Sequence, residues 1–82
     1  MTTNDYIDAL LPILGKMQGR RKDKEQKAAI ETLMVDLIKL KCDRRYSEEI
    51  KKLSLLATLS IFEEEHPDLG EELNNRIINQ HG

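Results

Sequence analysis

The stretch SEEIKKLSLLATLSIFEEE, residues Ser47 to Glu65, decides the fold because it is the most apolar segment of the chain. On a helical wheel it carries two apolar stripes instead of one, so it must be covered on two sides, by other helices of its own chain or by a second copy. Its uncharged span between Lys52 and Glu63 is only about half of the roughly 20 residues that a membrane crossing needs. We therefore expect a central core helix around which the other segments pack.

The two stripes of this helix are expected to have different partners. We expect the first stripe to meet the preceding helix, and it consists of Ile50, Leu53, Ala57 and Ile61. The second stripe exceeds what one peripheral helix can cover, and it consists of Leu55, Leu59 and Phe62. A two-fold interface is the commonest way to bury such a stripe, so the second stripe predicts a homodimer.

Length and composition predict a single helical domain over residues 1–82. Aromatic residues make up only 4% of the chain, so the core has to be built from Leu, Ile, Met and Ala, which suit helices better than sheets. Apolar periodicity and capping signals predict a small all-α bundle of four helices, at approximately 4–17, 23–43, 47–65 and 67–79. Asp23 and Ser47 are the expected N-caps of the second and third helices, and Pro67 separates the third from the fourth.

Pro12 lies inside the first predicted helix, where it removes one backbone hydrogen bond. It shares the polar side of the wheel with Asp8 and Gly15, so a bend that wraps the helix around the core is expected. The alternative is a break into two short helices at Leu11.

The sequence contains few residues in an arrangement suited to catalysis or metal binding. Its only cysteine, Cys42, excludes a disulfide within the chain, and with no secretion or lipidation signal visible we expect a cytoplasmic protein. Cys42 has no recognisable base, and the pair Glu63 and His66 falls short of the three or four ligands of a metal site. No phosphate-binding loop, nucleophile elbow or metalloprotease motif is present. We expect neither enzymatic activity nor a cofactor.

The acidic turn Glu63, Glu64 and Glu65 goes against a local rule, because negative charges at a helix C-terminus oppose the helix dipole. Such exceptions are candidates for function, here docking on a basic protein partner. The alternative is that glutamate is simply a good helix former, and that the next helix N-terminus or a nearby Lys or Arg offsets the repulsion.

Positive charge gathers in one part of the chain. Residues 16–52 hold twelve of the thirteen Lys and Arg for a balance of +5, whereas residues 53–82 have a balance of -5. This asymmetry either marks a binding face or lets the two halves attract one another. The residues that would contact a phosphate backbone are Lys16, Arg20, Arg21, Lys22, Lys24, Lys27, Arg44 and Arg45. Interspersed acids and the lack of interleaved aromatics weigh against that use.

These observations favour a non-enzymatic protein that binds another protein, as an adaptor, inhibitor, immunity factor or regulatory subunit, and that also self-associates. The alternative is a nucleic-acid-binding regulator that uses residues 16–27 together with Arg44 and Arg45.

Overall fold

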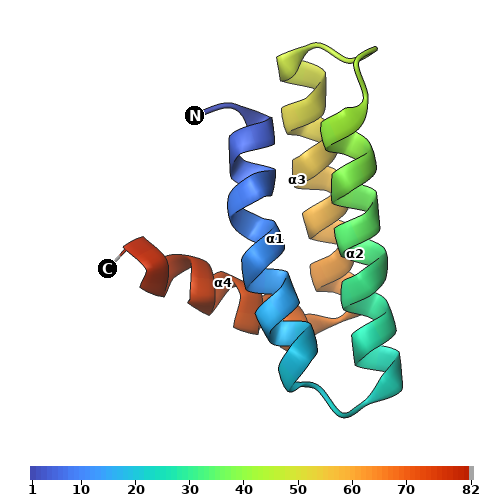
Figure 1. Ribbon diagram of the computed structural model, residues 1–82, viewed down its shortest axis with the longest axis vertical. Coiled ribbons are helices and arrows are strands. Elements are labelled where there is room, and N and C mark those ends of the chain that lie inside the picture. Colours follow the sequence, from blue (N-terminus) through green and yellow to red (C-terminus); the bar gives the residue numbers. More distant parts are fainter. Residues whose placement is uncertain (82) are drawn as a thin grey trace.

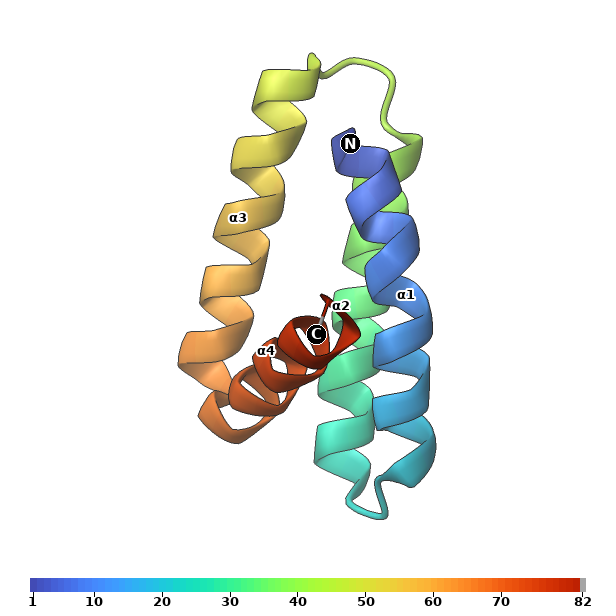
Figure 2. The same cartoon turned by 90° about the vertical axis from the view of Figure 1, so that its left-hand side faces the viewer.

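The computed structural model describes the backbone of residues 1–81 and the side chains of residues 1–79. Its four helices are α1 (Thr3–Arg20), α2 (Lys24–Cys42), α3 (Glu48–Glu65) and α4 (Pro67–His81). The first three run side by side in alternating directions, and α4 crosses them at one end of α3 (Figures 1 and 2). Over the described residues there is no strand, which confirms the predicted all-α fold. No helix among them is long and apolar enough to cross a membrane.

The helix boundaries follow from local capping chemistry. The Thr2 hydroxyl accepts a hydrogen bond from the backbone N–H of Asp5, and the Asp5 carboxylate accepts one from the backbone of Thr2, forming a capping box at the start of α1. Asp23 caps α2 and Ser47 caps α3, as predicted. Pro67 is the first residue of α4, where its missing N–H costs nothing.

The first helix is continuous through Pro12, so the alternative of two short helices is wrong. Pro12 is exposed, which places its ring away from the packed side of the helix. The hydrogen bond that proline removes is therefore lost on the solvent side, where water can satisfy the freed carbonyl of Asp8.

The core draws apolar side chains from all four helices. Helix α1 contributes the most, namely Ile7, Leu10, Ile13, Leu14 and Met17. The other helices contribute Ile30, Leu33, Leu37, Leu55, Phe62, Leu69 and Leu73. Helix α3 contacts each of the other three helices. It nevertheless places only two of its side chains in the fully buried set, so α1 is the more deeply buried element.

A cluster of charges fixes α4 against the turn between α1 and α2. The Glu72 carboxylate accepts hydrogen bonds from the guanidinium groups of Arg21 and Arg76, the latter at 3.1 Å. Partial burial raises the pKa of Glu72, but the hydrogen bonds and charges of Arg21 and Arg76 outweigh it, so the pKa lies below its ordinary value.

Glu72→Gln is expected to reduce the acid sensitivity of the fold. Because the pKa of Glu72 is lowered on folding, its interactions stabilise the protein above the unfolded pKa and are lost as the pH falls through the folded pKa. Between pH 6 and pH 3 the wild type should therefore lose about 0.5–1 kcal/mol more unfolding free energy than the variant, a figure kept small for a partly exposed pair. Urea titrations at each pH measure this, and equal losses in both proteins would contradict it.

Candidate functional site

One side of α3 faces solvent although it is apolar. Four large side chains on it are about half exposed or more: Ile50 (48%), Leu53 (66%), Leu56 (52%) and Ile61 (55%). Ala57 is exposed between them. Their spacing along the helix puts these five residues on one side, which we call the outward face of α3. Soluble monomers rarely expose a large contiguous apolar patch, and the larger ones mark interaction sites. The outward face is therefore the leading candidate site.

The structure reverses the expected roles of the two stripes of α3. Leu55 and Phe62 retain only 4% and 6% exposure, and Leu59 packs against the same core. Since the chain's own core already uses these side chains, Leu55 and Phe62 leave little exposed surface for the predicted dimer interface. The stripe that was expected to meet α2 instead makes up most of the outward face.

The helical wheel of α3 contains an indication of which apolar stripe faces solvent. Ser60 and Glu64 fall within the angular range of the outward face, and both are exposed. Over residues 53–62, the angular range of Leu55, Leu59 and Phe62 contains no polar side chain, although Glu48 and His66 fall within it at the two ends of the helix. Polar residues within an apolar stripe indicate the side that meets solvent.

The three glutamates of the acidic turn lie in different environments. Glu63 is half-buried, and its Oε1 accepts a hydrogen bond from Nδ2 of Asn74 in α4 at 3.1 Å. Glu64 is exposed and extends the outward face toward the C-terminal end of α3. Glu65 is exposed and turns toward α2. The three carboxylates therefore do not form one docking knob, because Glu63 helps to hold α4.

Glu65 borders a groove of about 290 Å³ between α2 and α3, which we call the acidic groove. Asp36 of α2 supplies a second carboxylate, and Thr32 and Thr58 add hydroxyl groups. The apolar part of its lining consists of Ala29, Leu33, Ile61 and Phe62. A Lys or Arg side chain from a partner can lay its methylene stem on such a lining and its charge beside the carboxylates. Asp36 cannot be recognised as part of this groove from the sequence, because it is far from Glu65 along the chain.

A second groove of about 300 Å³ lies where the start of α1 meets α3. Met1 and Tyr6 line it from one side, and Leu55 and Leu56 from the other. The backbone N–H of Thr3 donates a hydrogen bond to the Glu48 carboxylate there, and this bond lowers the pKa of Glu48. Because Leu56 also belongs to the outward face, this groove continues that surface toward α1.

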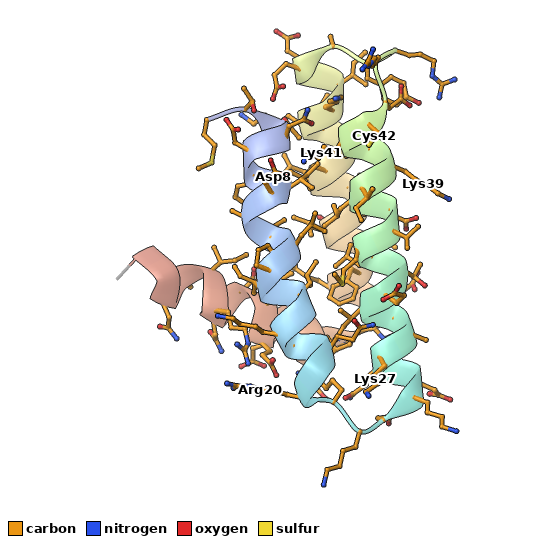
Figure 3. All side chains as sticks on the ribbon, in the orientation of Figure 1. Asp8, Arg20, Lys27, Lys39, Lys41 and Cys42 are labelled. Atoms are coloured by element: carbon orange, nitrogen blue, oxygen red, sulfur yellow. The ribbon has the colours of Figure 1, made fainter. Side chains whose placement is uncertain are left out.

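The structure does not gather the predicted nucleic-acid residues into one patch. Figure 3 shows Arg20 and Lys27 at one end of the bundle, whereas Cys42, which precedes the connection carrying Arg44 and Arg45, lies at the other. The 19 residues of α2 separate the two groups by about 28 Å. Some of these charges are also paired, because Arg21 contacts Glu72 and Arg45 contacts Asp43 at 3.0 Å.

The remaining candidates for chemistry stand apart from one another. Cys42 is exposed at the end of α2. The His66 ring packs on Phe62 with 5.6 Å between ring centroids. Within the part of the chain whose side chains are described, no three His, Cys, Asp or Glu residues are placed to hold a metal ion.

Comparison with known proteins does not add to this picture. The chain matches no protein family model, no curated protein and no solved structure. A helical bundle by itself does not imply a function, so the function has to be argued from the surface. The fold and the candidate site describe a small four-helix protein in which an exposed apolar helix face lies beside an acidic groove.

Proposed function

We propose that this chain is a non-enzymatic protein-binding module that docks through the outward face of α3, as an adaptor, inhibitor, immunity factor or regulatory subunit. The observation that carries the proposal is the exposure of Ile50, Leu53, Leu56 and Ile61 on one side of one helix. Covering such a face with another protein removes apolar surface from water, which is the main favourable term in protein association.

The opposite side of α3 supports this use. Leu55 and Phe62 anchor the helix in the core, so the outward face is held on a rigid element before a partner arrives. Preorganisation of this kind lowers the entropic cost of binding. The neighbouring carboxylates Asp36, Glu64 and Glu65 favour a partner whose apolar contact surface has a basic rim.

Nucleic-acid binding has less support. Its candidate residues lie at two ends of the bundle, and the outward face carries no Lys or Arg among its five residues. A phosphate-binding surface requires the reverse, a continuous run of positive charge.

Affinity capture with matched variants tests the proposed function. Tagged wild type, Leu53→Glu and Ile78→Glu are incubated with an extract of the native host, and retained proteins are compared. Leu53 and Ile78 are both 66% exposed, but Ile78 belongs to α4 and is not one of the residues of the outward face. We expect wild type and Ile78→Glu to retain the same protein, and Leu53→Glu to retain at least about tenfold less, which corresponds to 1.4 kcal/mol. Equal retention by all three proteins would refute the proposed function.

A further inference from the structure

We propose that the outward face of α3 binds the same face of a second copy of this chain, with the two α3 helices antiparallel about a two-fold axis. This inference rests on the proposed function and names the partner of the same surface. It places the homodimer contact on residues other than the buried stripe Leu55, Leu59 and Phe62.

The sizes of the side chains along the outward face favour self-pairing in one register. At a spacing of seven residues, Ile50 and Ala57 occupy one set of seam positions and Leu53 and Ser60 the other. In an antiparallel pair, a residue of one set lies opposite a residue of the other set. The register that places Leu53 opposite Ala57 of the second copy also places Ile50 opposite Ser60 of the second copy. Each layer then matches one large side chain with one small one.

A parallel pair lacks this complementarity. It would pair Ile50 with Ile50 and Leu53 with Leu53, which fills two layers well, but it would also pair Ala57 with Ala57 and Ser60 with Ser60, which leaves the next two layers underfilled. Such voids lower stability. It would also bring Glu64 of the two copies together, with repulsion between like charges.

Charge at the ends of α3 favours the antiparallel register as well. Continuing the same register carries Glu64 and Glu65 over the connection between α2 and α3 of the second copy, which contains Asp43, Arg44 and Arg45 and is followed by Glu48 and Glu49. Because Arg45 already pairs with Asp43, the attraction in this register depends on Arg44. Glu64 and Arg44 are both exposed, and the ion pairs found in the described part of the chain involve neither of them. Two such contacts, one at each end, fix the direction of the pair.

The two-fold axis passes close to Leu56, so Leu56 of the two copies lie side by side and widen the apolar seam. The proposed interface is a single pair of helices and therefore falls at the small end of specific interfaces. Such an interface supports a dissociation constant on the order of 10–100 µM. The dimer would then form and separate with protein concentration.

Sedimentation equilibrium of the full chain from about 5 to 500 µM tests the pairing, since this range spans the expected dissociation constant. We expect a reversible monomer–dimer equilibrium for wild type and Ile78→Glu. Leu53→Glu should weaken it at least tenfold while its helical circular dichroism signal is unchanged, because Leu53 is 66% exposed and outside the core. A wild type that stays monomeric at the highest concentration overturns the proposal.

Cross-linking determines the register. In a Cys42→Ser background, Leu53→Cys and Ala57→Cys chains are mixed and oxidised mildly. The proposed register yields mainly the disulfide between the two different chains, whereas a parallel pair yields the two homodimeric disulfides.

A second readout is charge exchange. Glu64→Arg and Arg44→Glu should each weaken the dimer about threefold to tenfold at low salt, and the double variant should recover the dimer affinity. Failure of both readouts overturns the antiparallel register.

Self-pairing and the broader protein-binding function fail in different ways. If wild type is monomeric but Leu53→Glu still loses a captured host protein, self-pairing is overturned and the proposed function stands. If the dimer forms as described and all variants capture the same proteins, the outward face serves the dimer alone and the proposed docking on another protein is overturned.

Discussion

Leu14→Ala is expected to lower the free energy of unfolding by about 3–4 kcal/mol, which is the middle of the range for fully buried leucines. Leu14 is 0% exposed and belongs to a core cluster that draws on all four helices, so the cavity left by truncation has neighbours on several sides. A chain of 82 residues has a total stability of roughly 4–12 kcal/mol. The variant should therefore lose a quarter or more of its stability, with a fall in Tm of about 15–25 °C. Urea and thermal unfolding, followed by circular dichroism at a few micromolar protein, measure both quantities.

Leu53→Ala is the matched control, because it removes the same atoms from a leucine that is 66% exposed. Alanine is at least as good a helix former as leucine, so the change in unfolding free energy should stay within about 0.5 kcal/mol. Similar losses in the two variants would show that Leu14 is not in the core, or that α3 does not turn Leu53 to solvent.

The helices themselves could be predicted from the sequence because their signals are local. Asp23 and Ser47 cap helices whose first turns lie within three residues of them, and Pro67 acts on the residue before it. Such signals need no knowledge of the rest of the fold. This explains why the predicted and observed ends of α2 and α3 differ by one residue at most.

The candidate site could not be predicted in the same way. A helical wheel shows that α3 has two apolar stripes and that Ser60 interrupts one of them, but the positions of α1, α2 and α4 decide how much of each stripe is covered. The acidic groove depends on the approach of Asp36 in α2 to Glu65 in α3, residues that are far apart in the sequence. These relations arise from packing between distant segments, so the acidic groove and the degree of exposure of the outward face follow only from the fold.

Gly70→Ala is expected to destabilise the protein by about 1–2 kcal/mol, the usual cost of adding a methyl group to a filled site. Gly70 is buried in the first turn of α4, where α4 leaves the end of α3. A Cβ atom there would lie 2.7 Å from Cγ of Glu63 and 3.0 Å from its Cα. The Cγ can move, but the Cα belongs to the backbone of α3, so the two helices would have to separate. That movement would disturb Leu69 and Leu73, which are 2% and 1% exposed in the core.

Gly15→Ala is the control, and its effect on the free energy of unfolding is expected to have the opposite sign. Apart from its chain neighbours and the nearby backbone of its own helix, no atom lies within 4 Å of a Cβ placed at Gly15. Neither glycine has a positive φ, so alanine suits the backbone conformation at both positions. Within α1 the substitution should therefore stabilise the protein by about 0.5–1 kcal/mol through helix propensity alone. The same propensity gain is available at Gly70, so a loss of stability there measures the contact between α3 and α4. Stabilisation by both substitutions would mean that α4 does not pack closely on Glu63, and the position of α4 at the end of the bundle would have to be revised.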